Sequence, residues 1–98
     1  MPRIRWSLQS REDLLSIRRY IAFQNPVRAK QYVRKIRSSV NRLKQFPLLG
    51  EVVPDLGRGD VRQVLHGNYR VIYQTDGKSV EVLSIVHSAR LLDEGTID

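Results

Sequence analysis

The chain has 98 residues, which is enough for one domain with a single modest hydrophobic core. It contains no cysteine, which excludes a disulfide framework, a thiolate metal site and a cysteine nucleophile. The N-terminus lacks the apolar core of a signal peptide, and no apolar run approaches the ~20 residues needed to cross a bilayer. We therefore expect a soluble cytoplasmic protein without a cofactor or metal.

The net charge of +7 is unevenly distributed along the chain. Residues 1–46 carry twelve Lys and Arg against two acidic residues, whereas residues 47–98 carry five against eight. The two parts therefore have net charges of +10 and −3. This asymmetry predicts an acidic partner, either nucleic acid phosphates or an acidic peptide or protein, although such charges can also simply solvate a helix face.

Alternating residues predict a half-buried strand at the N-terminus. Ile4, Trp6 and Leu8 alternate with polar side chains over about residues 3–8. Ser10 and Asp13 then have the spacing of a capping box, so a helix is predicted over about residues 11–24. Its buried stripe is expected to consist of Leu14, Ile17 and Ile21.

Asn25 and Pro26 predict the start of a second helix, since asparagine is a good N-cap and proline is tolerated at the first helical position. The helix should run to about Gln45 and form an antiparallel hairpin with the first, because almost no loop separates them. Its apolar face is predicted to consist of Ala29, Tyr32, Val33, Ile36, Val40 and Leu43. The remaining surface has no acidic residue and carries Arg28, Lys30, Arg34, Lys35, Arg37, Arg42 and Lys44.

The second half of the sequence predicts an irregular connector over residues 47–59 and three strands at about 60–66, 69–75 and 79–87. Gly67-Asn68 should join the first pair of strands, and Asp76-Gly77 the second as a type I′ turn. The last strand has two apolar faces and is expected to be central. The order β-α-α-β-β-β predicts an α+β fold for a single domain over residues 1–98, with an antiparallel sheet packed on a two-helix hairpin.

Short motifs along nearly the whole chain carry further information through their order and spacing. They are Trp6, Asp13-Leu14, Ile17, Tyr20-Ile21, Asn25-Pro26, Leu43, Phe46-Pro47, Gly50, Val53-Pro54-Asp55-Leu56, Arg62, Asn68-Tyr69-Arg70-Val71-Ile72-Tyr73 and Val86-His87-Ser88-Ala89-Arg90. Together they resemble the RelE/ParE superfamily of bacterial type II toxins, and more specifically its ParE-like branch. The fold that this resemblance implies is the one predicted from periodicity.

The resemblance implies a growth-inhibiting toxin encoded beside an antitoxin, whose C-terminal segment wraps the toxin and blocks it. ParE-like members are associated with inhibition of DNA gyrase, whereas RelE-like members cut mRNA on the ribosome. We therefore expect a cognate antitoxin and DNA gyrase as partners, with gyrase inhibited by protein contact. Nucleic acid is expected only in a toxin-antitoxin complex at its operator, or if the chain is a ribonuclease. A third possibility is a domain that has lost toxicity and only binds an antitoxin.

Ribonuclease chemistry needs a proton acceptor for the 2′-hydroxyl, a proton donor for the leaving oxygen, and cations around the phosphate. By the resemblance, Arg70 matches a phosphate-stabilising arginine, but Val61 and Gln63 stand where RelE enzymes carry catalytic lysines. The acidic tail at 91–98 also lacks the tyrosine found near the end of such enzymes. No catalytic residue is therefore expected. A residual nuclease site would use Arg62, Arg70, His87 and Arg90, with His66 as a further candidate.

Other roles compete for these residues. Arg70 could instead pair with Glu81 on the neighbouring strand. The aromatic residues are expected mainly in the core, with those near the sheet edge framing an antitoxin groove. They are Trp6, Tyr20, Tyr32, Tyr69 and Tyr73. The residues expected to bind the antitoxin or the target are Arg28, Arg34, Lys35, Arg42, Tyr69, Arg70 and Arg90. An antitoxin strand could also extend the exposed sheet edge.

Overall fold

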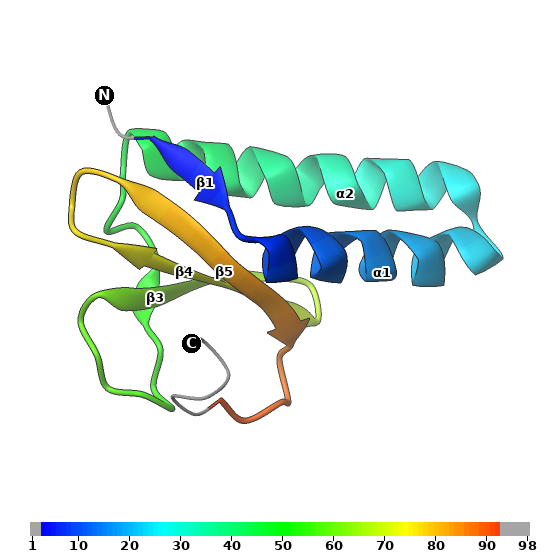
Figure 1. Ribbon diagram of the computed structural model, residues 1–98. Helices are drawn as coiled ribbons and strands as arrows, with labels where there is room; N and C mark the ends of the chain where they lie inside the picture. Colours follow the sequence, from blue (N-terminus) through cyan, green and yellow to red (C-terminus); the bar gives the residue numbers. More distant parts are fainter. Residues whose placement is uncertain (1–2, 93–98) are drawn as a thin grey trace.

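The computed structural model describes residues 3–92, which form two long helices and one five-stranded sheet. The helices lie side by side against one face of the sheet (Figure 1). The elements are β1 (Ile4–Trp6), α1 (Leu8–Gln24), α2 (Pro26–Asn41), the 3-10 turn η1 (Arg42–Lys44), β2 (Glu51–Val52), β3 (Val61–His66), β4 (Tyr69–Thr75) and β5 (Val80–His87). Within residues 3–92, no helix has the length and apolar character needed to span a membrane.

The predicted α+β fold is confirmed, with a correction to the sheet. Its strand order is β1-β5-β4-β3-β2, and β3, β4 and β5 form the predicted antiparallel meander. However, β1 pairs with β5 in parallel, with Ile4 opposite Val80, so the sheet is mixed. The helical hairpin and strands β2 to β4 together form the long connection that a parallel pair requires. β5 is an interior strand, as its two apolar faces predicted, while the connector adds the short edge strand β2 that the sequence did not reveal.

The start of α1 is fixed to β5 by side chains. Ser7, rather than Ser10, is the N-cap, and its Oγ accepts the N–H of Ser10 at 3.0 Å and donates to the carbonyl of Leu83 at 2.8 Å. Asp13, expected in a capping box, instead accepts the N–H of Ile85 at 2.9 Å. β1 pairs with β5 only as far as Val82, so the backbone groups of β5 beyond it have no neighbouring strand there. The side chains of Ser7 and Asp13 satisfy these groups instead.

α2 begins where the sequence predicted. The Asn25 side chain accepts the N–H of Arg28 at 3.1 Å, and Pro26 lies in the first turn. The α-helix ends at Asn41, and η1 carries the chain on to Lys44. Both predicted apolar stripes are confirmed, with Leu14, Ile17, Ala29, Ile36, Val40 and Leu43 buried and Ile21, Tyr32 and Val33 half-buried.

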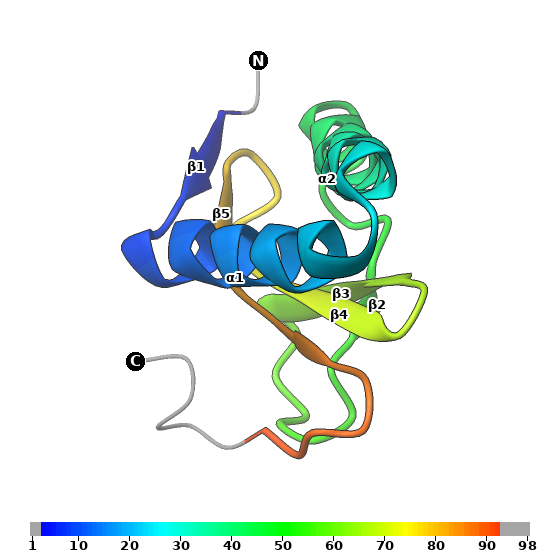
Figure 2. The ribbon, with the colours of Figure 1, turned by 90° about the vertical axis from the view of Figure 1, so that its right-hand side faces the viewer.

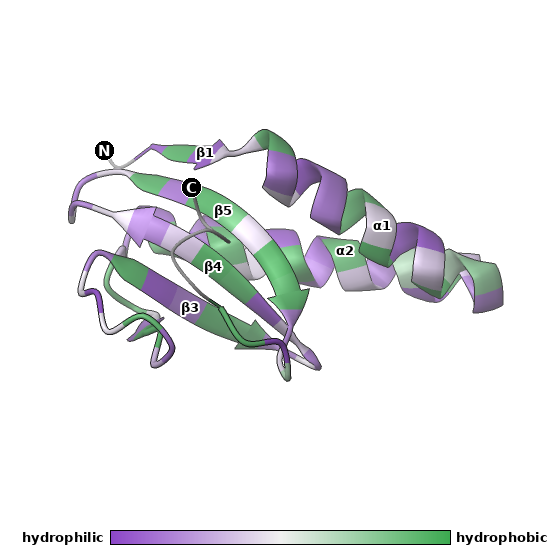
Figure 3. Ribbon diagram, turned by 60° about the horizontal axis from the view of Figure 1, so that its bottom comes forward, coloured by the Kyte–Doolittle hydropathy of each residue, from purple (hydrophilic) through white to green (hydrophobic). Residues whose placement is uncertain are grey.

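The core occupies both faces of the sheet. The helix face is filled by Leu14, Ile17, Ile36, Val40, Val71, Val82 and Ile85. A second cluster on the opposite face consists of Val53, Val61, Ile72, Val86 and Leu92. Figure 3 looks toward this second face, where apolar stretches of β4 and β5 lie side by side. The connector and residues 88–92, here called the strap, supply Val53 and Leu92 to this second cluster.

The two hairpin turns differ in their geometry. At 67–68 only Gly67 has a positive φ, of 57°, which is the placement that a type II′ turn requires. A Cβ at Gly67 would also lie only 2.7 Å from the hydroxyl of Tyr32. The predicted type I′ turn at Asp76 is wrong, because Asp76 does not have a positive φ. Its carboxylate instead accepts the backbone N–H groups of residues 78 and 79, both at 2.8 Å.

Candidate functional site

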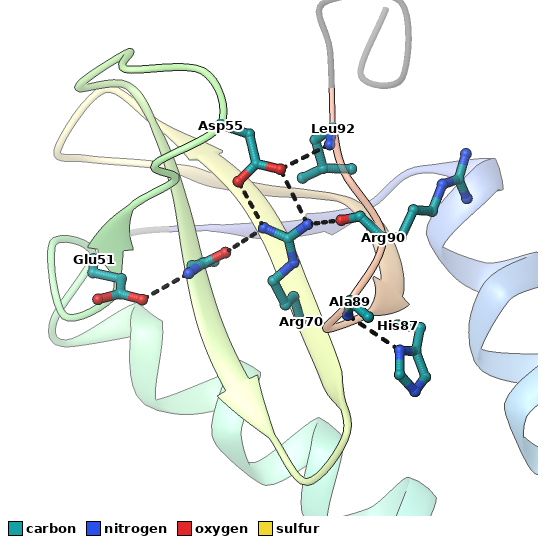
Figure 4. Close-up of polar contacts among 8 residues, drawn as sticks. Glu51, Asp55, Arg70, His87, Ala89, Arg90 and Leu92 are labelled. Atoms are coloured by element: carbon teal, nitrogen blue, oxygen red, sulfur yellow. Dashed lines mark hydrogen bonds and ion pairs between the residues drawn. The ribbon is translucent and has the colours of Figure 1, made fainter.

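Arg70 lies at the centre of a polar network on the sheet face opposite the helices (Figure 4). Its Nη1 donates to Asp55 Oδ1 and to Gln63 Oε1, both at 3.1 Å. Its Nη2 donates to Asp55 Oδ2 at 3.3 Å and to the carbonyl oxygen of Arg90. Because the Arg70 side chain is only 7% exposed, these partners enclose the guanidinium.

The predicted ion pair between Arg70 and Glu81 is wrong, and the strand register explains why. Arg70 stands opposite Val86 on β5, whereas Glu81 is level with Gln74 near the other end of β4. Glu81 instead lies 4.0 Å from Arg5 of β1. The carboxylate that Arg70 binds comes from the irregular connector, where no periodic pattern predicts the path of the chain.

Asp55 extends the network to the strap. Its Oδ2 accepts the N–H of Leu92 at 2.8 Å, and the Leu92 side chain is buried in the second cluster. The hydrogen bond from Arg70, followed by that from Leu92, lowers the pKa of Asp55 below its ordinary value. On the other side, the Gln63 side-chain amide donates to Glu51 of β2 at 2.6 Å. The network therefore joins β2, β3, β4, the connector and the strap.

The histidines do not meet Arg70. Successive residues of a strand point to opposite faces of a sheet. The register places Tyr69 between His66 and His87 on the helix face, so Arg70 projects from the other face. Neither histidine is therefore placed to act as a proton acceptor beside the Arg70 cation.

The remaining candidate nuclease residues are also separated. Arg62 is level with Tyr73 on the helix face and donates to the carbonyl of Gly50 at 2.9 Å. The His87 ring accepts the N–H of Ala89 at 3.1 Å. In Figure 4, the His87 ring and the Arg90 guanidinium both point away from Arg70. Arg90 contributes to the network through its backbone carbonyl and not through its side chain.

A second candidate region lies at the end of the molecule where α1 meets α2, which faces the viewer in Figure 2. The Tyr32 hydroxyl donates to the carbonyl of His66 at 3.2 Å. The Tyr32 ring packs edge-on against His66, with centroids 5.0 Å apart, and against Tyr69 at 6.1 Å. Tyr69 contacts His87 in the same way at 6.0 Å. Burial, and then the neighbouring Tyr69, raise the pKa of Tyr32.

Two adjoining hollows flank Tyr32. The first, of about 220 Å³, is lined by Tyr20, Arg28, Tyr32 and Tyr69 among others. The second, of about 500 Å³, includes Arg28 and Tyr32 again. We call this region the hairpin-tip surface and define it by Tyr20, Val27, Arg28, Tyr32, Lys35 and Tyr69. It brings together three predicted binding residues, Arg28, Lys35 and Tyr69. Tyr20, expected mainly in the core, is 72% exposed.

A groove of about 500 Å³ lies between the helices and β1. Apolar side chains and three arginines line it: Trp6, Leu14, Leu15, Val33, Arg11, Arg18 and Arg37. None of these arginines forms an ion pair within the described part of the chain. We call it the Trp6 groove. It shares no lining residue with the hairpin-tip surface.

Four predicted binding residues lie outside both surfaces: Arg70 and Arg90 belong to the polar network, and Arg34 and Arg42 lie on or next to α2. Arg34 is exposed on α2 but lines neither the hollows nor the groove. Arg42 lies at the opposite end of α2 and lines a separate hollow with Pro47. Among residues 3–92 there is no cluster of histidine, aspartate and glutamate suited to a metal ion.

Comparisons with known proteins identify relatives of this fold. Residues 4–92 match the family model of the ParE toxin of the type II toxin-antitoxin system parDE. A chain in the solved chromosomal ParDE toxin-antitoxin system from P. aeruginosa has a TM-score of 0.71 and 23% identity, covering 89% of this chain and 96% of that one. A chain of the toxin-antitoxin complex RelBE2 from Mycobacterium tuberculosis has a TM-score of 0.62 and 19% identity, and the match covers 89% of this chain and 99% of that one. A search of curated proteins gives no significant match.

Proposed function

The chain belongs to the ParE toxin family of type II toxin-antitoxin systems, and we propose that it arrests growth in the cytoplasm by binding DNA gyrase. A cognate antitoxin is its natural inhibitor in this proposal. The toxin acts on gyrase by protein contact, without chemistry of its own on RNA.

The enclosure of Arg70 is the observation that carries this choice of mechanism. A phosphate-stabilising arginine must present donors where negative charge develops in the transition state. Here the guanidinium is neutralised by Asp55, and both terminal nitrogens already donate to protein oxygens. Val61 and Gln63 add no cation at the neighbouring positions of β3. Arg70, which matches the phosphate-stabilising arginine of the ribonucleases, therefore has a structural role in this chain.

The Trp6 groove supports the antitoxin part of the proposal. An amphipathic helix binds a groove by burying its apolar face, and charges along the rim set its orientation and steer its approach. The groove combines an apolar floor with three arginines that lack ion-pair partners in the described residues. A helical antitoxin segment with an apolar stripe flanked by Asp and Glu fits this combination.

The test is a supercoiling and DNA-cleavage assay of purified gyrase with this protein, beside a translation reaction probed for mRNA cuts. Loss of supercoiling or trapped cleaved DNA, reversed by the antitoxin and with intact mRNA, is the expected result. Active gyrase together with codon-phased mRNA cuts would overturn it in favour of a ribonuclease. Addition of the antitoxin is the control in both reactions, because a contaminating nuclease would not respond to it.

A further inference from the structure

The hairpin-tip surface has the character of a protein interface. Tyr20 and Val27 are 72% and 66% exposed, and Phe23, three residues from Tyr20 on α1, is 93% exposed. Side chains three apart on a helix lie on neighbouring positions of its surface. Exposed apolar side chains gathered in this way mark interaction sites, and tyrosine and arginine are the residues most often found at their energetic centres.

The floor of this surface is already ordered. Tyr32 is held by its hydrogen bond to the carbonyl of His66 and by edge-on contacts with His66 and Tyr69. Gly67 allows the hydroxyl to approach the turn, since a Cβ there would lie 2.7 Å from it. A partner that binds this floor loses little side-chain entropy on the toxin side, which favours affinity.

Charge decides which partner the surface fits. Arg28 and Lys35 line its hollows, and no Asp or Glu within residues 3–92 does. Neither cation forms an ion pair among the described residues. A second copy of this chain would bring like charges together, which costs binding energy, whereas an acidic protein surface would neutralise them.

We propose that the hairpin-tip surface binds an acidic, apolar-centred patch of the protein that the toxin inhibits, while the antitoxin segment occupies the Trp6 groove. This inference rests on the proposed function of inhibition by protein contact. It adds that target binding and antitoxin binding use different residues and can be separated by substitution.

The experiment measures growth arrest after induced expression, and antitoxin affinity of the purified protein. Arg28→Glu should reduce toxicity and leave antitoxin affinity within about twofold. It places an acid in the first turn of α2, where the helix dipole stabilises it, so loss of the fold does not explain the effect. Tyr20→Ser, on the exposed side of α1, is the second variant. Each should weaken target binding about tenfold or more, the size expected at the centre of an interface.

The matched control is Lys30→Glu, which makes the same charge change on α2. Lys30 lies two residues from Arg28, about 200° around the helix, and lines neither surface. It should leave toxicity unchanged. Arg37→Glu in the Trp6 groove should have the reverse phenotype, with full toxicity and an antitoxin affinity lowered about tenfold.

Several results would overturn the inference. One is an equal loss of toxicity for Lys30→Glu and Arg28→Glu. A second is a loss of antitoxin affinity that accompanies the loss of toxicity in Arg28→Glu and Tyr20→Ser, here called the tip variants. A third is a wild-type chain that does not arrest growth. Dimers in sedimentation that Arg28→Glu and Tyr20→Ser abolish would assign the surface to a second copy of the chain. Binding of a DNA oligonucleotide that the same substitutions abolish would assign it to nucleic acid. Growth arrest that the two tip substitutions reduce, while gyrase stays fully active, would reject gyrase as the target. It would still support target binding by the hairpin-tip surface.

Discussion

The guanidinium of Arg70 and the carboxylate of Asp55 form a two-point pair, with nitrogen–oxygen distances of 3.1 and 3.3 Å. Their side chains are 7% and 13% exposed, so water does little to solvate either charge. The pair connects an inner strand to the part of the connector that follows β2, and the same carboxylate holds the strap through Leu92. Its main consequence is therefore for stability.

Asp55→Asn should lower the free energy of unfolding by about 3 kcal/mol, because it leaves a buried cation without its counter-charge. Urea unfolding followed by circular dichroism measures the loss. Glu81→Gln is the control, since the Glu81 pair with Arg5 spans 4.0 Å at the surface and should contribute less than about 1 kcal/mol. Equal effects of the two substitutions would contradict the structural role assigned to Arg70.

The stability of the protein should fall in acid, through its paired carboxyls. The hydrogen bond from Arg70 lowers the pKa of Asp55, and those from Arg58 and then Gln74 lower the pKa of Asp60 to about 2, from an ordinary value of 3.8. Such a group stabilises the fold fully above its unfolded pKa, and this contribution is lost as the pH falls through the folded pKa. Chemical unfolding at a series of pH values should show the loss between about pH 4 and pH 2. Asp55→Asn should make the decline shallower; an unchanged slope would argue against the pair.

Gly67→Ala should destabilise the protein for two reasons that act at one position. Its φ of 57° costs a residue with a Cβ about 1–2 kcal/mol, and the Cβ would collide with the Tyr32 hydroxyl. Gly59→Ala is the matched control, because no atom lies within 4 Å of its Cβ position and its φ is not positive. Thermal unfolding should therefore show a lower midpoint for Gly67→Ala alone. The same variant should also weaken target binding, because Tyr32 loses its position.

The helices and the meander could be predicted from the sequence because their apolar residues recur with the periods of a helix and a strand. Asp13 shows where this reasoning fails: its spacing from Ser10 suits a cap, yet it accepts a hydrogen bond from Ile85, 72 residues away. That partner depends on β1 ending early along β5. The partner of Arg70 was missed for the same reason, since the position of Asp55 depends on the folded connector. The Trp6 groove did have a local signal, with Arg11, Leu15 and Arg18 at helical spacing.

Antitoxin association through the Trp6 groove should be steered by its arginines and held by its apolar floor. Arg37→Gln should slow association and flatten its dependence on salt, because screening acts on exposed charges during the approach. Leu15→Ser should mainly speed dissociation, since Leu15 is 44% exposed here and a docked antitoxin segment would bury it. Stopped-flow or surface-plasmon-resonance kinetics at two salt concentrations separate these effects, with Lys30→Gln as the control for net charge. An antitoxin whose association rate responds equally to Lys30→Gln and Arg37→Gln is attracted by the overall charge of the protein, and the groove would then not be its docking site.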